Sequence, residues 1–440
     1  MTIVIATTAC STTPIRATGA KYFALSQVQL FINNNDSRGI ELPPMLPTNI
    51  DLICLSHLRW GFVFQRPQHL MSRFARERRV FYIEEPIFED NQRPHLRSTL
   101  CPQTSVHVCT PILPARLDAR EVVTHVRILL DQMLQQHRIV DYVAWYYTPM
   151  ARDFAFSLKP KATVYDCMDE LSAFAGAPPA MKRNELALFQ EADLVFTGGP
   201  SLFESKQKQH PSVHLFPSSV DVAHFASAQT ITAEPEDQRL LGRPRVGYAG
   251  VIDERMDLEL LGNIAAMRPD WQLVLLGPVA KINPSTLPQA PNIHYLGIKR
   301  YEELPAYFSG WDIGMLPFAI NDSTRYISPT KTPEYLAAGL RVISTPIRDV
   351  VRPYAELGLV QIAATAQYFV QAAEVILGDP PNAAYKAHVN RFLSQSSWDK
   401  TWQEMNKLMN TTYIQKNRVA PMPKSAVARS VKQAEGAIHV

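Results

Sequence analysis

The stretch SPTKTPEYLAAGLRVI, residues 328–343, decides the fold because it joins a helix start, a short helix and a strand. Its hydroxyl-rich opening suits the N-terminus of a helix. Gly339 suits the end of that helix, and the apolar run that follows, Arg341 to Ser344, favours a buried strand. A helix leading straight into a buried strand is typical of an α/β domain with a parallel sheet.

The same alternation extends outward on the N-terminal side. Within the C-terminal half, earlier strands are predicted at 245–250, 271–277, 292–296 and 312–316. The N-terminal half has its own set, at 51–56, 79–83, 106–109, 142–147, 162–165, 193–196 and 213–216. Helical patterns separate most of these runs, so the sequence predicts two doubly wound parallel sheets.

The alternation of strand and helix patterns stops at several places, which we interpret as domain boundaries. We expect a disordered extension over 1–48, an N-terminal Rossmann-like domain over 49–225 and a linker over 226–243. A C-terminal Rossmann-like domain over 244–396 and a helix over 397–412 follow, the helix with Trp398 and Met405 on one face. Residues 413–440 are predicted to form a disordered basic tail.

Composition excludes several classes of protein. With 44 basic and 41 acidic residues, the net charge of +3 gives no reason to expect nucleic acid as a partner. The five cysteines lack zinc-site spacing and fit a reducing compartment. No apolar run reaches the roughly 20 residues of a membrane span, and the start lacks the basic region of a secretion signal. We expect a cytoplasmic protein, with peripheral association at the inner face of the membrane left open.

Function is sought in the loops after strands, because open parallel sheets bind ligands there. Gly250 stands at the carboxyl end of the strand predicted at 245–250, where a glycine lets a phosphate approach the backbone. Arg255 is placed to hold a diphosphate through two parallel hydrogen bonds. The alternative is that the glycine serves only a tight turn and that Arg255 is solvated.

The helix start at 328–334 offers a second set of ligand groups. Ser328, Thr330 and Lys331 supply hydroxyl and ammonium donors for phosphate oxygens, and Glu334 can accept two hydrogen bonds from a ribose diol. The alternative is an ordinary capped helix that carries surface charges.

These segments resemble the donor-binding half of GT-B glycosyltransferases, and they are most similar to glycosyltransferase family 4. The similarity is carried by the runs at 248–250, 312–317 and 328–343. In the N-terminal half, the runs at 66–70, 165–170 and 217–221 resemble bacterial members that act in exopolysaccharide and teichuronic acid synthesis. The resemblance covers roughly residues 50–411 and implies two Rossmann-like domains facing a cleft. It assigns the acceptor to the first domain and the donor to the second, and it implies that the helix at 397–412 crosses back.

The resemblance also implies residue roles. Glu334 aligns with the second acid of the family's Glu-x7-Glu motif, which recognises ribose. The first acid would fall at Tyr326, which is not acidic, so the resemblance does not decide how the donor sugar is contacted. Tyr326 stays a candidate for contact with a phosphate or with the acceptor. Arg255 and Lys331 correspond loosely to the family's phosphate-binding basic pair.

Three further candidates lie in the N-terminal half. His57 follows the first strand, in the loop that the family places beside the transferred sugar; the alternative is a structural histidine. Asp169 follows a strand and can orient an acceptor hydroxyl or take its proton; the alternative is that the carboxylates of this loop cap a turn or are solvated. Arg66, at a helix start, suits an anionic partner such as phosphate or acceptor, or else an ion pair with Glu84 or Glu85.

The predicted reaction moves a sugar from a nucleoside diphosphate sugar, by default UDP-linked, to a hydroxyl of a glycan or lipid-linked acceptor. No Asp-x-Asp triplet occurs in the chain, so we expect no metal and no cofactor. Similarity to family 4 implies retention of anomeric configuration; if the reaction inverts, Asp169 becomes the candidate base. A nucleotide-sugar epimerase or hydrolase and a non-catalytic nucleotide-sugar-binding subunit are the alternatives. An oxidoreductase is disfavoured because no Gly-x-Gly-x-x-Gly follows a strand.

Overall fold

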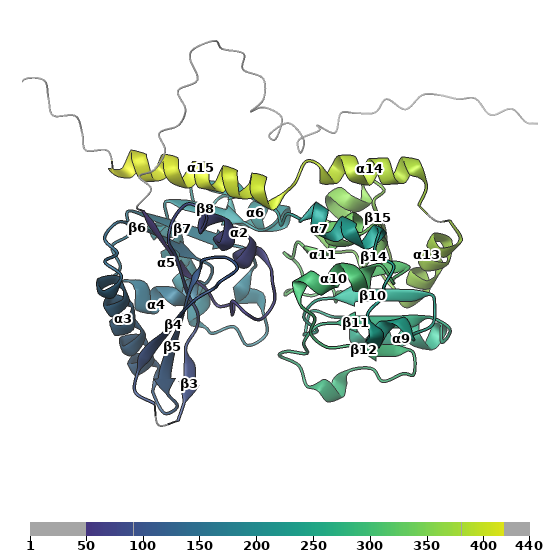
Figure 1. Ribbon diagram of the computed structural model, residues 1–440, viewed down its shortest axis with the longest axis horizontal. Coiled ribbons are helices and arrows are strands. Elements are labelled where there is room, and N and C mark those ends of the chain that lie inside the picture. The colour runs from purple at the N-terminus through teal and green to yellow at the C-terminus, as the bar shows by residue number, and fades with distance from the viewer. Residues whose placement is uncertain (1–49, 91, 380, 418–440) are drawn as a thin grey trace, which may run out of the picture. The chain divides into compact units, whose positions relative to one another are not determined.

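The computed structural model describes residues 50–90, 92–379 and 381–417. The extension predicted over 1–48 and most of the tail predicted over 413–440 lie outside these residues. The described chain forms two doubly wound sheets, as predicted from the alternation of strands and helices (Figure 1).

The N-terminal sheet has the strand order β3-β5-β2-β1-β6-β7-β8-β9. All its neighbouring strands pair in parallel except β4, which pairs antiparallel with β5. Its strands are β1 (Asp51–Leu55), β2 (Val80–Ile83), β3 (Ile87–Glu89), β4 (His95–Leu100), β5 (His107–Pro114), β6 (Tyr142–Tyr146), β7 (Ala162–Cys167), β8 (Leu194–Thr197) and β9 (Val213–Leu215). Its helical segments are α2 (Arg66–Phe74), α3 (Ala119–Gln136), η1 (Pro149–Ala151), α4 (Arg152–Ala155), η2 (Leu171–Ala173), α5 (Ala180–Glu191) and α6 (Pro200–Lys206).

Burial on both faces explains why the central strands are continuous apolar runs. Along β1, Ile53 and Leu55 pack into a core with α3 and α5, whereas Leu52 and Cys54 pack into a core with α2 on the opposite face. Alternate side chains of a strand point to opposite faces, so a doubly covered strand needs apolar residues at every position. The sequence did not predict β3 and β4, because their side chains are mostly exposed and carry no such run.

The C-terminal sheet is entirely parallel and has the order β12-β11-β10-β13-β14-β15. This corresponds to the 3-2-1-4-5-6 order of dinucleotide-binding folds, in which the order reverses between the first and fourth strands. Its strands are β10 (Arg245–Ala249), β11 (Gln272–Leu276), β12 (Ile293–Tyr295), β13 (Ile313–Leu316), β14 (Arg341–Ser344) and β15 (Val360–Ile362). Its helical segments are α7 (Val222–Ala226), η3 (Ser227–Gln229), α8 (Glu236–Arg239), α9 (Leu258–Met267), η4 (Pro284–Thr286), η5 (Tyr301–Glu303), α10 (Leu304–Phe308), α11 (Lys331–Ala337), α12 (Arg348–Val350), η6 (Val351–Ala355), α13 (Ala366–Gly378) and α14 (Ala383–Leu393).

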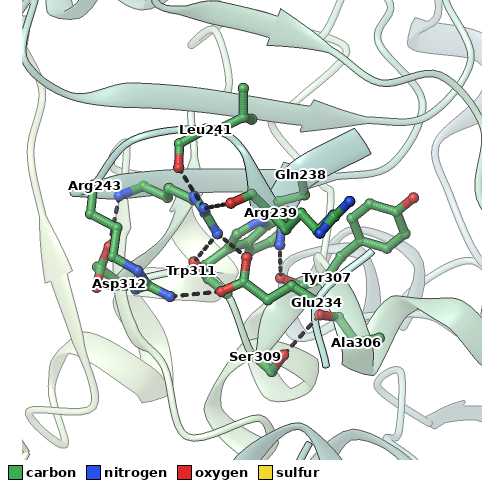
Figure 2. A network of polar contacts seen from close by, with 12 residues as sticks. Glu234, Gln238, Arg239, Leu241, Arg243, Ala306, Tyr307, Ser309, Trp311 and Asp312 are labelled. Carbon is green, nitrogen blue, oxygen red and sulfur yellow. Dashed lines mark hydrogen bonds and ion pairs between the residues drawn. The ribbon is translucent and has the colours of Figure 1, made fainter. Parts of the chain in front are cut away.

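The chain crosses between the two domains earlier than the segment 226–243 that we predicted as the linker. Phe216 packs in the N-terminal core, and Val220 already packs in the C-terminal core. The polar residues of 226–243 are instead held against the start of β10 by a network of polar contacts (Figure 2). In this network the indole of Trp311 donates to Gln238 at 2.9 Å, and Arg243 pairs with both Glu234 and Asp312. Because these polar side chains have partners within the C-terminal domain, the segment 226–243 belongs to that domain although its sequence is polar.

The last described helix, α15 (Trp398–Asn417), packs on the N-terminal domain although it follows the C-terminal one (Figure 1). Trp398, Trp402, Met405 and Met409 are buried in the same core as Phe74 of α2. Leu393 at the end of α14 still belongs to the C-terminal core, so the chain crosses back within 394–397. The helix continues through Asn417, five residues beyond the end we predicted, and near its end Lys416 pairs with Asp193 at 2.8 Å.

Candidate functional site

A pocket lies where the C-terminal sheet reverses its strand order. The strand-end pocket, as we call it, is lined by the carboxyl ends of β10 and β11 and by the loops that follow β12 and β13. Residues after β7 and before α2, in the N-terminal domain, complete it. The space amounts to about 1200 Å³, open solvent included. Ligands of open parallel sheets bind at such a switch point, so the topology and the cavity agree on the location of the site.

Gly250 lets a lysine lie against the backbone at the end of β10. Its φ of 150° lies in a region that favours glycine, and a Cβ built there would stand 2.2 Å from Cε and 2.6 Å from Nζ of Lys331. Any other residue would displace the ammonium group from the pocket. The two segments that the sequence singled out separately, the end of β10 and the start of α11, therefore lie against each other at Gly250 and Lys331.

The start of α11 faces the pocket. Thr330 occupies the N-cap position, and its side chain makes no capping hydrogen bond, so the hydroxyl is available to a ligand. Lys331 follows it, with Nζ 5.4 Å from the centre of the Tyr248 ring, and it makes no ion pair with any described carboxylate. Burial lowers the pKa of Lys331; the negative charge of Glu334 opposes this shift, and the neighbouring Arg255 adds to it. A phosphate would add a counter-charge in direct contact with the ammonium group, and Ser328 lines the pocket beside this helix start.

Glu334 lies one turn into α11 and also lines the pocket. Burial raises its pKa to about 7, and the positive charge of Lys331 opposes this rise. Its carboxylate makes no side-chain hydrogen bond within the part of the chain that the structure describes. A partly buried carboxylate without a partner suits a ligand that donates hydrogen bonds.

Arg255 lines the pocket but already has a partner. Its guanidinium binds Asp253 through contacts of 2.6 to 3.1 Å and lies 5.4 Å from the centre of the Phe174 ring. The side chain is thus neither simply solvated nor free. The pair with Asp253 fixes its position while the remaining N–H donors stay unassigned.

Asp169 reaches the same pocket from the loop after β7. Its side chain has no hydrogen bond or ion pair among residues 50–90, 92–379 and 381–417. Burial raises the pKa of Asp169, although the charges of Arg255, Arg66 and Lys331 oppose the rise. The pocket therefore joins an unpaired carboxylate of the N-terminal domain to the cationic groups of the C-terminal domain.

Arg66 lines the pocket but forms a buried ion pair beneath it. Its side chain is 1% exposed and that of Asp166 is 0% exposed; the two groups share contacts of 2.8 to 3.1 Å. It also donates to the carbonyl of Phe216 at 2.8 Å. The alternative of an ion pair is confirmed for Arg66, but its partner is Asp166 and not Glu84 or Glu85. Glu84 instead contacts Arg59 and accepts a hydrogen bond from the hydroxyl of Thr110.

Two predicted residues lie outside the pocket lining. His57 follows β1, and burial together with the charge of Lys281 lowers its pKa to about 4, so its ring is neutral at pH 7. Its Nδ1 is buried and has no partner among the described residues. Tyr326, at the position of the family's first acid, packs against the core of the N-terminal domain.

The sequence did not single out several residues that line the pocket. They come mostly from loops after strands and from the segment before α2: Phe64, Met168, Ile298, Lys299, Tyr301 and Phe318. The position of the pocket at the carboxyl ends of the strands was expected, but the loop after β12 contains a single glycine, Gly297, and no serine or threonine, so it carries no phosphate-binding motif. Apolar and aromatic residues there resemble ordinary core residues until the chain is folded.

No protein-family model matches the chain. Among curated proteins, it is similar to TuaH of Bacillus subtilis (strain 168), which is named as a candidate teichuronic acid biosynthesis glycosyltransferase. The two are 24% identical over 273 residues, which cover 58% of this chain and 67% of that protein.

Solved structures with a similar fold extend over most of the chain. Sucrose-phosphate synthase from Thermosynechococcus elongatus matches with a TM-score of 0.63 and 15% identity, over 83% of this chain and 99% of that chain. Anabaena HepE in complex with UDP and glucose matches with a TM-score of 0.59 and 12% identity, over 82% of this chain and 99% of that chain. These likenesses confirm the predicted GT-B fold.

Proposed function

We propose that this chain, an enzyme of the glycosyltransferase class with the GT-B fold, transfers a sugar from a UDP-linked donor to a hydroxyl acceptor. The setting proposed is cell-envelope or exopolysaccharide synthesis, which the similarity to TuaH supports. One observation carries the proposal: the strand-end pocket gathers Lys331, Glu334 and Asp169, three charged groups without ion-pair partners among the described residues. The UDP and glucose in the HepE complex support the choice of donor.

The donor is held by the C-terminal domain. Lys331, Arg255 and the Thr330 hydroxyl bind diphosphate oxygens, and the glycine at 250 leaves room for them. Glu334 accepts hydrogen bonds from the ribose diol. Hydrogen bonds to charged groups contribute roughly 1.5–3 kcal/mol each, enough for two or three of them to dominate donor affinity.

Catalysis consists of stabilising the leaving diphosphate while the acceptor is positioned. As the bond between the sugar and the diphosphate breaks, negative charge grows on the phosphate oxygens, and fixed cations lower the energy of that state. Lys331 and Arg255 are the cations proposed for this role, so the reaction proceeds without a metal ion. By its resemblance to family 4 the enzyme retains the anomeric configuration of the donor sugar.

The acceptor approaches from the N-terminal domain. Asp169 orients the attacking hydroxyl or takes its proton, and its raised pKa suits a group that exchanges protons. His57 acts from the neighbouring loop as a neutral hydrogen-bonding group. The acceptor proposed is a glycan or a lipid-linked saccharide, met in the cytoplasm or at the inner face of the membrane. No helix within the described ranges combines the length and apolar character needed to cross a bilayer.

A two-step experiment tests the proposal. Thermal unfolding is followed with UDP-, GDP- and ADP-sugars; a donor at a hundred times its Kd should stabilise the protein by about 2.7 kcal/mol. The best donor is then incubated with lipid-linked and glycan acceptors, with and without EDTA, and products are weighed by mass spectrometry. Transfer that persists in EDTA supports the proposal, and a requirement for added magnesium contradicts the metal-free part.

The other outcomes distinguish the rival functions. Release or isomerisation of the sugar without an acceptor identifies a hydrolase or an epimerase. If a nucleotide sugar binds tightly but is not turned over with any of the acceptors, the chain is a binding subunit. Tyr326, at the position of the family's first acid, is the reason to test this alternative. The absence of stabilisation by every nucleotide sugar overturns the proposal as a whole.

A further inference from the structure

Tyr301 carries a buried hydroxyl without a partner at the wall of the strand-end pocket. The residue opens η5, in the loop after β12, and lines the pocket together with Glu334. Its hydroxyl oxygen is buried and has no hydrogen-bond partner in the described part of the chain. A buried hydroxyl without a partner is unfavourable, and most such groups in folded proteins are satisfied.

The ring of Tyr301 is held on several sides. It stacks on His224 of α7 at 4.3 Å between ring centres and 11° between planes. Phe64 lies 4.8 Å away, and His69 of α2 contacts the ring edge-on at 5.5 Å. The ring nitrogen Nε2 of His224 is also 3.0 Å from the backbone carbonyl of Tyr301. The position of the hydroxyl is therefore set by packing rather than by a hydrogen bond of its own.

The surroundings make this hydroxyl a hydrogen-bond donor. Burial raises the pKa of Tyr301, and the negative charges of Glu334 and Asp221 raise it further. The group thus stays protonated, within electrostatic reach of the carboxylate assigned to ribose. Neither the mechanism above nor any packing contact uses the O–H.

We propose that the Tyr301 hydroxyl binds a pentose hydroxyl of the donor nucleotide beside Glu334, and that it makes the pocket selective for ribonucleotides. This inference rests on the proposed function. A site with a buried polar group rejects an analogue that lacks the matching hydroxyl, because the protein group is then left unpaired. Glu334 alone tolerates a deoxy sugar better, because its carboxylate remains accessible to the other hydroxyl and to water.

The experiment compares three probes by calorimetry: UDP, 2′-deoxy-UDP and 3′-deoxy-UDP. The wild-type protein should bind UDP at least tenfold more tightly than one of the two deoxy analogues, a ratio of the size expected for one buried hydrogen bond, about 1.4 kcal/mol. Tyr301→Phe keeps the ring and removes only the hydroxyl. It should bind UDP about tenfold more weakly, bind that analogue about as well as the wild type does, and so lose the preference.

A matched control separates this effect from general damage. Tyr295→Phe removes a hydroxyl from β12 that donates to the carbonyl of Pro288, away from the pocket lining, and should leave the UDP preference unchanged. Both variants should keep the wild-type circular dichroism. If the Tyr301→Phe protein retains the full preference for UDP, the assignment of Tyr301 is wrong while the proposed function stands. If the wild-type protein binds none of the three nucleotides, the UDP-dependent function fails and the assignment fails with it.

Discussion

At the scale of the residue, the proposed site depends on charged side chains that have no ion-pair partner within the described part of the chain. Lys331 and Glu334 lie on one short helix, yet burial moves their pKa values in opposite directions, downward for the ammonium and upward for the carboxyl. Burial disfavours the charged form of each group, so both gain from a ligand that restores charge or hydrogen bonds. The pocket therefore suits a ligand that carries both an anion and a diol, as the proposed donor does.

Removal of either side chain should weaken donor binding. We expect Lys331→Ala and Glu334→Ala each to reduce the affinity for UDP-glucose by about 1.5–3 kcal/mol, because each loses a charge-assisted hydrogen bond. Calorimetric titration measures the effect, with Lys386→Ala on the exposed face of α14 as the control. Equal affinities in all four proteins would place the donor elsewhere.

Donor affinity should also depend on pH. The pKa of Glu334 in the protein without donor is about 7, so most of the carboxyl is protonated at pH 6. It must release this proton to the solvent before its carboxylate can accept hydrogen bonds from both hydroxyls of the ribose diol. UDP-glucose itself does not titrate near neutral pH. Affinity should therefore rise by roughly tenfold from pH 6 to pH 8, since one pKa unit corresponds to a factor of ten. Lys331 acts in the opposite direction, because its loss of charge at higher pH weakens phosphate binding.

The variant Glu334→Gln isolates the carboxyl. It keeps a hydrogen-bonding group that does not titrate, so the rise between pH 6 and pH 8 should disappear, and any remaining slope belongs to Lys331 and other groups. A rise of the same size in the glutamine variant would show that another residue titrates.

At the scale of the element, α15 joins the end of the chain to the first domain. Its buried face packs in the core of that domain, and Asp399 in its first turn pairs with Arg73 of α2 and with Arg76, just beyond α2, at 3.0 Å each. The pair with Arg76 is exposed on both sides and contributes little. The apolar face, with Trp398 and Met405, supplies the stabilisation, because it removes large side chains from water.

Truncation of that face should destabilise the protein. Met405→Ala removes a side chain that is 0% exposed, and we expect the free energy of unfolding to fall by about 2–5 kcal/mol. Glu404→Ala, one position earlier on the exposed side of the helix, should change it by less than about 0.5 kcal/mol. Urea unfolding measures both; similar midpoints for the two variants would mean that α15 contributes little to the fold.

At the scale of the whole molecule, the two domains meet at places beside the pocket. The backbone N–H of Ser201, in α6, donates to Asp349 of the C-terminal domain at 3.0 Å. The two crossing segments also touch each other, because the hydroxyl of Ser396 donates to that of Ser219 at 3.1 Å. A Cβ built at Gly199 would stand 2.3 Å from Asp349 Oδ2 and 2.7 Å from Cβ of Ser328. The contact between the domains thus reaches Ser328, a residue of the pocket lining that we propose binds the donor.

Gly199→Ala tests whether this contact positions the site. The residue has extended backbone, so alanine is tolerated locally, but its methyl group should force Ser328 and Asp349 to move. Because small displacements at a site reduce its efficiency steeply, we expect the affinity for UDP-glucose to fall by on the order of tenfold. Gly378→Ala, where a Cβ meets nothing within 4 Å, is the control. Wild-type affinity in the Gly199 variant would exclude the positioning role.

The alternation of apolar runs and helical patterns was sufficient, without coordinates, to predict two parallel sheets, because a strand covered on both faces must be apolar throughout. Local chemical requirements also singled out the helix start at 330–334 and the glycine at 250, and both line the strand-end pocket. Tertiary structure alone decided which distant groups meet. It paired Arg66 with Asp166 across 100 residues, brought Asp169 and Lys331 to one pocket and moved the domain crossing before Val220. It also left the buried hydroxyl of Tyr301, a residue of the pocket lining, without a partner among the described residues. The physical reason is that backbone preferences and periodicity are local, whereas ion pairs, aromatic stacks and shared pockets depend on chain segments that approach only after both domains have folded.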